Sequence, residues 1–187
     1  DGSGVFIDDL VPPLVGGLRS PHAMVWGPDQ NNDGLADLYV AGASSNAVHI
    51  YDGQSGAPIG NGVFAQSGII TPTDLTFGPD RSGDGENDLY VLNFSVSSRI
   101  VWFDGITGVF GGVLVSQANA NGYTSGENIQ FGPDVNGDQT SELYATSAAN
   151  GNVYRFDGDT GVFLDFFTTG GGNLQSGRDL VFKDGRL

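Results

Sequence analysis

The chain has 187 residues, of which 22 are Asp or Glu and 7 are Lys or Arg, so its formal net charge is -15. A surface this acidic repels phosphate groups and anionic lipid headgroups, so nucleic acid is not expected as a partner. The hydrophobic fraction of 39% is too high for an acidic disordered tail, and we expect a folded core. There is no cysteine for a disulfide or a thiolate metal site, and no apolar run approaches the length of a membrane span.

Residues 1–20 are predicted to contain the last strand of a preceding repeat unit. The segment Asp1–Phe6 matches Asp157–Phe163 with one residue fewer, which places the strand at residues 5–7. The chain opens at Asp1 without an initiator Met, which indicates either a processed mature chain or a fragment.

Three repeat units of roughly 50 residues follow, predicted to span residues 21–70, 71–123 and 124–177. Each unit opens with an apolar strand that ends in Gly-Pro-Asp, and an acidic loop leads to a second strand with the alternation of a half-buried strand. A third strand ends in Asp-Gly, a strong hairpin signal, and a fourth strand leaves that turn. Residues 178–187 match the first strand of a further unit, with Lys183 and Asp184 standing where an acidic loop would begin.

These units predict an all-β fold, a β-propeller-type array of four-stranded antiparallel blades with three complete repeats and partial units at both ends. An isolated four-stranded sheet cannot cover both of its faces, so neighbouring units are expected to stack. Aromatic residues recur at two equivalent positions and are predicted to form the core between blades. They are Trp26, Phe77 and Phe131 in the first strands and Tyr39, Tyr90 and Tyr144 in the second.

The acidic loops carry oxygen-bearing residues at positions one, three, five, seven and nine, counted from the Asp of Gly-Pro-Asp. Calcium takes six to eight oxygen ligands, and alternate side chains of a tightly curled loop converge on one point, with a backbone carbonyl at position seven. Calcium is therefore the expected cofactor. The candidate ligands are Asp29, Asn31, Asp33, Leu35 and Asp37 in the first loop, Asp80, Ser82, Asp84, Glu86 and Asp88 in the second, and Asp134, Asn136, Asp138, Thr140 and Glu142 in the third.

The position-six residue ranks the three loops. Gly34 and Gly85 permit a sharp turn in the first two loops, whereas Gln139 stands there in the third, which is expected to bind calcium more weakly. The alternative interpretation is that all three loops are ordinary Asn-Gly and Asp-Gly turns of an acidic β-protein.

The pattern Asp-x-Asn-x-Asp-Gly-x-x-Asp-Leu at residues 29–38 resembles the calcium loops of integrin-type FG-GAP and VCBS propeller repeats. The stretch from Leu-Tyr-Val to Phe-Asp-Gly-x-Thr-Gly is similar to propeller repeats of secreted bacterial surface proteins, and the resemblance extends from Pro21 to Phe182. It implies calcium-stiffened blades and a role in adhesion or surface display. The chain lacks the Gly-Ala-Pro element of the full FG-GAP motif, so the functional implication is an analogy.

We therefore expect a non-enzymatic extracellular or cell-surface protein of secreted bacterial type, with a structural, surface-display or self-assembling role. Its expected partners are further blades or other copies that pair with open strand edges, with a glycan or protein as a possible ligand. Two alternatives stay open: an adhesin that binds its ligand on the propeller rim, and a lactonase-like or lyase-like enzyme with a site in the central channel. No nucleophile or phosphate-binding motif accompanies the two histidines, His22 and His49, which are expected at the surface or in turns.

Overall fold

The computed structural model describes residues 8–94, 99–168 and 176–182, which form three four-stranded antiparallel sheets and one short 3₁₀ turn, η1 (Val15–Gly17). The all-β class and the three four-stranded units predicted from the sequence are thus confirmed. The first sheet comprises β1 (Pro21–Gly27), β2 (Asp37–Gly42), β3 (Ala47–Tyr51) and β4 (Pro58–Ala65). The second comprises β5 (Pro72–Gly78), β6 (Asp88–Asn93), β7 (Arg99–Phe103) and β8 (Phe110–Val115), and the third β9 (Gly126–Phe131), β10 (Leu143–Ser147), β11 (Val153–Phe156) and β12 (Phe163–Thr168).

Each sheet is a simple meander in which every strand pairs with its neighbours in the chain. The register between first and second strands is identical in the three sheets, because the aromatic residue before the Gly-Pro-Asp turn always faces a leucine. The pairs are Trp26 with Leu38, Phe77 with Leu89 and Phe131 with Leu143. A one-residue slip would move every apolar side chain to the opposite face, so this shared register maintains one stacking surface along the whole molecule.

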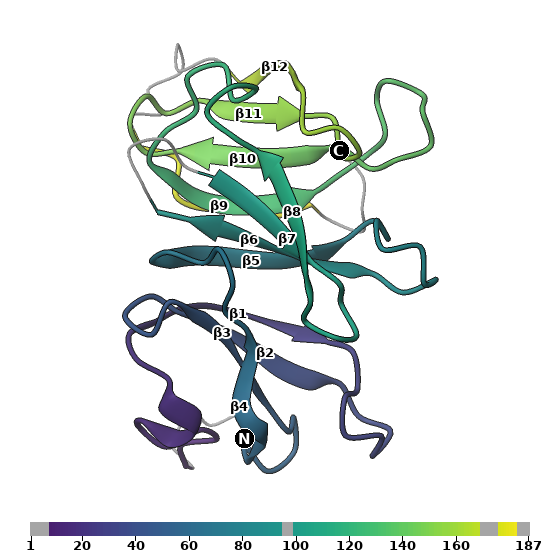
Figure 1. Cartoon of the computed structure of the whole chain (residues 1–187). Helices are drawn as coiled ribbons and strands as arrows, with labels where there is room; N and C mark the ends of the chain where they lie inside the picture. Colours follow the sequence, from purple (N-terminus) through teal and green to yellow (C-terminus); the bar gives the residue numbers. More distant parts are fainter. Residues whose placement is uncertain (1–7, 95–98, 169–175, 183–187) are drawn as a thin grey trace.

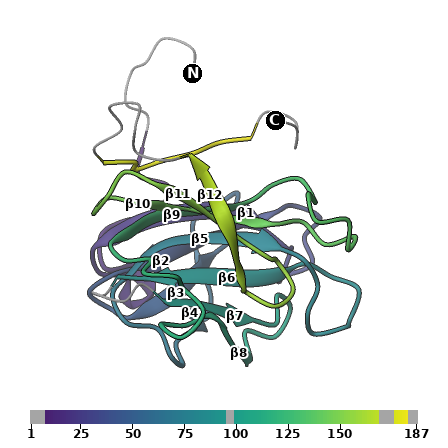
Figure 2. The same cartoon turned by 90° about the horizontal axis from the view of Figure 1, so that it is seen from above.

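The three sheets stack in chain order (Figure 1), and from above they overlie one another (Figure 2). The tyrosine of each second strand packs edge-to-face on a phenylalanine of the following unit. The ring centroids are 5.0 Å apart for Tyr39 and Phe77, 4.7 Å for Tyr90 and Phe131, and 4.8 Å for Tyr144 and Phe182. These edge-to-face contacts contribute about 0.5–1.5 kcal/mol each beyond the burial of apolar area.

The two ends of the described chain differ from the complete units. Phe182 takes the place of Phe77 and Phe131, although no strand is formed within residues 176–182. The strand predicted at residues 5–7 lies outside the described residues. Trp26, expected in the core between blades, is instead exposed on the first sheet, because no described part of the chain covers the face of β1 that carries it.

The glycine of each Gly-Pro-Asp turn allows the sheets to approach. A Cβ atom on Gly27 would lie 2.3 Å from the ring of Phe77, and one on Gly78 would lie 2.1 Å from the ring of Phe131. Contacts this short do not occur between real atoms, so a side chain at either position would force the neighbouring sheet away. The glycine is therefore required by packing between units as well as by the turn.

His49 corrects an expectation, since it is 1% exposed within β3 and does not lie at the surface or in a turn. Its Nδ1 lies 3.1 Å from the Gly16 carbonyl and 3.0 Å from the Gly62 carbonyl, and its Nε2 lies 2.8 Å from the Ser45 hydroxyl. Burial lowers the pKa of His49, because the charged ring would lose its hydration. The residue thus has a structural place under the segment around η1.

Candidate metal-binding loops

The three acidic loops join the first strand of each sheet to the second, and they project from the same side of the stack (Figure 1). Each leaves its strand through Gly-Pro-Asp and ends where the next strand begins. Two β-strand ends therefore determine where every loop starts and finishes.

The aspartate at position one organises each loop by accepting the N–H of the residue at position six. Asp29 Oδ2 accepts the N–H of Gly34 at 2.7 Å, and Asp80 Oδ2 accepts that of Gly85 at 2.8 Å. In the third loop, Asp134 Oδ2 accepts the N–H of Gln139 at 2.9 Å. The three loops thus share one curl. Water competes for charge-assisted bonds of this type at these exposed sites, so they shape the loop more than they stabilise the fold.

The third loop forms the same curl although Gln139 replaces glycine. The φ angle at position six is 87° for Gly34, 94° for Gly85 and 76° for Gln139. A residue with a Cβ pays about 1–2 kcal/mol for this left-handed conformation. Gln139 therefore gives the third loop a conformational strain without changing its shape, and its weaker calcium binding stays a prediction.

Positions three and five also hold the loop in its curled form. The carboxylate at position five accepts the N–H of position seven in every loop. Asp33 accepts the N–H of Leu35 at 2.8 Å, Asp84 that of Glu86 at 2.9 Å, and Asp138 that of Thr140 at 2.8 Å. Each carboxylate uses one oxygen in these bonds, and the second oxygen of Asp138 also accepts Asn136 Nδ2 at 2.9 Å. A carboxylate oxygen has two lone pairs, so a cation can be bound without breaking these bonds.

The position-nine acids, Asp37, Asp88 and Glu142, are fully buried at the base of the loops. Each accepts the backbone N–H of position two: Asp37 from Gln30 at 2.7 Å, Asp88 from Arg81 at 2.7 Å, and Glu142 from Val135 at 3.1 Å. Burial raises the pKa of Asp37, with a smaller opposing effect of the backbone N–H bonds, so its charge is costly without a cation.

Two of these buried acids carry an oxygen atom without a hydrogen bond, Asp37 Oδ1 and Glu142 Oε2. The corresponding Asp88 Oδ1 accepts Gly105 N at 3.1 Å. Gly53 N interacts with Asp37 and lowers its pKa, but it forms no regular hydrogen bond with Asp37 Oδ1. A buried unsatisfied carboxylate oxygen is costly, and a bound cation is one way to offset that cost.

An additional acid stands beside every loop and was not recognised as part of the site from the sequence. It is the aspartate of the Asp-Gly turn after the third strand, Asp52, Asp104 or Asp157. Asn31 Nδ2 donates to Asp52 Oδ2 at 2.6 Å, and Asn136 Nδ2 donates to Asp157 Oδ2 at 2.9 Å. The recurrence of Asp-Gly at one offset in all three repeats was the available signal, but it was interpreted only as a turn.

Asp52 shows how strongly this position favours a carboxylate. The Ser55 hydroxyl and backbone N–H lower the pKa of Asp52 to about 2, and the Asp33 carboxyl lies close enough to interact with it. The first loop thus gathers the charges of positions one, five and nine together with a fourth from outside the loop. Such an arrangement repels itself in water and favours a divalent cation.

The donor set fits a hard cation in kind. It combines carboxylates with an amide or hydroxyl oxygen at position three and the backbone carbonyl at position seven, the mixture that calcium uses. Among residues 8–94, 99–168 and 176–182, no three His, Cys, Asp or Glu side chains already converge as a metal-holding group. The carboxylates turn instead toward the loop N–H groups, and both oxygens of the position-one aspartates accept such bonds. Calcium would be held by the remaining lone pairs of these carboxylates together with the carbonyls.

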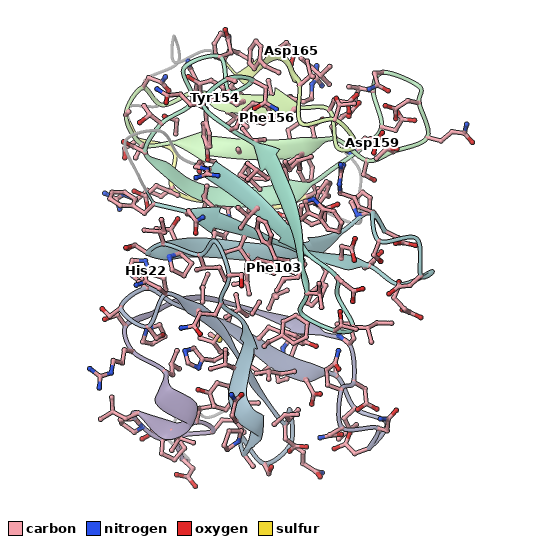
Figure 3. All side chains as sticks on the ribbon, viewed as in Figure 1. His22, Phe103, Tyr154, Phe156, Asp159 and Asp165 are labelled. Atoms are coloured by element: carbon pink, nitrogen blue, oxygen red, sulfur yellow. The ribbon has the colours of Figure 1, made fainter. Side chains whose placement is uncertain are left out.

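The second loop is also tied to the third unit through Arg81. Its guanidinium donates to the Asp159 carbonyl, lies 3.3 Å from the Asp159 carboxylate and sits 5.4 Å from the ring centroid of Trp102. Asp159 lies on the side of the loops, opposite His22 (Figure 3). The loops therefore occupy a boundary between units, where their order affects the stacking.

Comparison of the chain with models of known protein families and with curated proteins gave no match in either case. None of the described residues forms a helix of the length and apolarity needed to cross a membrane. Fold and site together define a class: an all-β repeat protein with one acidic loop per four-stranded unit.

Proposed function

We propose that the chain is a calcium-binding β-propeller-type array from an extracellular, non-enzymatic surface protein, in which bound calcium stiffens the stacked blades. The observation that carries the proposal is the threefold recurrence of one loop conformation, with an acid at positions one, five and nine and a further acid beside it. Turns that served only to connect strands would not need a buried acid at their base.

The stiffening role follows from where the loops are attached. Each loop joins the first strand of its sheet to the second, and the second loop also contacts the next unit through Arg81 and Asp159. Calcium would neutralise the mutual repulsion of the loop carboxylates and fix the ends of both strands. A scaffold on a cell surface or in a self-assembling layer requires this kind of rigidity.

The test is thermal unfolding of the whole chain with excess calcium and with excess chelator, together with calorimetric titration of the metal. At a free calcium concentration one hundred times the dissociation constant, each site contributes about 2.7 kcal/mol, so chelation should lower the melting temperature by several degrees. Asp33→Ala should lower the measured stoichiometry, whereas Asp9→Ala, an exposed acid outside the loops, should leave it unchanged.

Two results would contradict the proposal. One is an identical melting curve in calcium and in chelator with no heat of binding. The other is equal calcium binding by the Asp33→Ala variant and the parent chain, which would place the metal away from the loops.

A further inference from the structure

Strand β1 of the first sheet exposes two apolar side chains whose counterparts in the other sheets are more buried. Met24 is 72% exposed, whereas Leu75 and Ile129 at the same position are 4% and 2% exposed. Trp26 is 55% exposed, whereas its counterparts Phe77 and Phe131 are partly buried. Exposed apolar surface of this size on one face indicates a contact surface.

The molecule itself shows what covers this face elsewhere. Phe77 packs on Tyr39 of the preceding sheet, and Phe131 packs on Tyr90 of the preceding sheet. Leu75 belongs to the same apolar cluster as Ala41 and Val48 of the first sheet. The covering surface is therefore the second and third strands of a preceding unit, with the tyrosine as its central contact.

Around Met24 and Trp26 lies a hollow of about 570 Å³ with an apolar lining. Leu38 and Val40 form its floor, and Leu10 and Pro21 line it from the N-terminal side. Leu38, Val40 and Tyr51 pack against Val11, Val15 and Leu18, so the segment around η1 covers the outer part of the face and leaves the inner part open.

The segment around Leu10 lies where the fourth strand of a preceding unit lies in the other two sheets. Where two complete units meet, a glycine in the turn after the third strand of one unit approaches the fourth strand of the preceding unit. A Cβ on Gly108 would lie 2.2 Å from the Phe64 carbonyl oxygen, and a Cβ on Gly161 would lie 2.0 Å from the Leu114 carbonyl oxygen. The equivalent Gly56 approaches the Leu10 carbonyl oxygen in the same way, at 1.6 Å. Leu10 therefore occupies the fourth-strand position of a preceding unit.

We propose that the face formed by Met24, Trp26, Leu38 and Val40 docks the first three strands of a further repeat unit, joined in the same polypeptide to the segment that holds Leu10. The chain runs from a third strand into a fourth in every complete unit, so the covalent connection follows from the position of Leu10. The proposal rests on the stacked array of the proposed function and is independent of its calcium part.

The experiment extends the chain with a copy of its own repeat. Residues 124–156 are placed directly before Asp1, so that the copied third strand leads into Asp1-Gly2 as β11 leads into Asp157-Gly158. Trp102→Phe leaves Trp26 as the single tryptophan, and its emission and acrylamide quenching are measured with calcium and with chelator. Emission should move to shorter wavelength and quenching should fall by about twofold, because a half-exposed ring becomes covered.

A matched control carries Tyr144→Ser in the copied segment only, which removes the central contact and should restore the quenching of the unextended chain. A second pair of variants needs no extension. Met24→Ser with Trp26→Ser should leave the melting temperature of the unextended chain within a few degrees of the parent, whereas Ile129→Ser with Phe131→Ser should lower it strongly.

Three results would overturn the proposal. Trp26 could stay equally quenched in a folded extended chain. The Met24 and Trp26 substitutions could destabilise the unextended chain as much as the Ile129 and Phe131 substitutions. Alternatively, Trp26 of the unextended chain could become protected as concentration rises, with dimers in sedimentation, which would make a second copy the occupant. Loss of calcium binding alone would not alter the expected quenching of Trp26, the melting temperatures of the variants or the sedimentation result.

Discussion

Asp74 should make the stability of the protein fall as the pH rises from about 4 to about 7. The residue lies in β5, is 8% exposed, and accepts Ile129 N from the third sheet at 2.7 Å. Burial raises its pKa to about 7, and the negative charge of Asp179 adds to the effect. The folded state therefore prefers the protonated acid.

The magnitude follows from the difference between the two states. The pKa rises from 3.8 to about 7 on folding, a difference of about 3 units. At about 1.36 kcal/mol per unit, the stability due to Asp74 is complete below pH 3.8, falls as the pH rises from 3.8 to about 7, and is lost above that pH, a change of about 4 kcal/mol. Asp74→Asn removes this titration while its amide oxygen still accepts the Ile129 N–H. Asn128, the counterpart of Asp74 in the third sheet, has this side chain naturally.

The assay is urea unfolding of the parent chain and the Asp74→Asn variant from about pH 3.5 to pH 8. The variant should gain about 4 kcal/mol relative to the parent across this range, since groups that titrate equally in both chains cancel. Asp179→Asn should shift the parent's pH dependence to lower pH, and Asp9→Asn should not. A constant difference between the parent and Asp74→Asn over the whole range would refute the argument.

Two further predictions concern packing and acid stability. Gly78→Ala should lower the free energy of unfolding by about 1–3 kcal/mol, because its Cβ would meet the Phe131 ring at 2.1 Å. Gly177→Ala, whose nearest contact is Thr146 at 3.6 Å, should be nearly neutral, and equal melting temperatures for the two variants would disprove the packing requirement. Because burial lowers the pKa of His49, the neutral ring is favoured on folding, and stability should be lost as the pH falls below the ordinary histidine pKa of 6.5. His49→Gln should reduce that loss in melting curves, and an unchanged pH profile would count against it.

The strands were predictable because their signals are local. Alternating apolar residues and the Gly-Pro-Asp and Asp-Gly turns recur in three repeats, and β3, β7 and β11 all end just before the predicted Asp-Gly. The loop positions one, five and nine were also evident, since a pattern within ten residues depends only on the nearby chain. The bonds from Asp29, Asp80 and Asp134 to position six show that this local pattern produces one local conformation.

What the sequence alone could not decide depends on contacts between residues far apart in the chain. Asp52 approaches Asn31 because the third strand ends beside the loop, and His49 is buried because the segment around η1 covers it. Trp26 has the same local sequence context as Phe77 and Phe131 and was expected to be buried with them, yet it is exposed. Local pattern determined which residues are apolar and which face they share, but only the stacking of whole sheets decided which of those faces meets a neighbour.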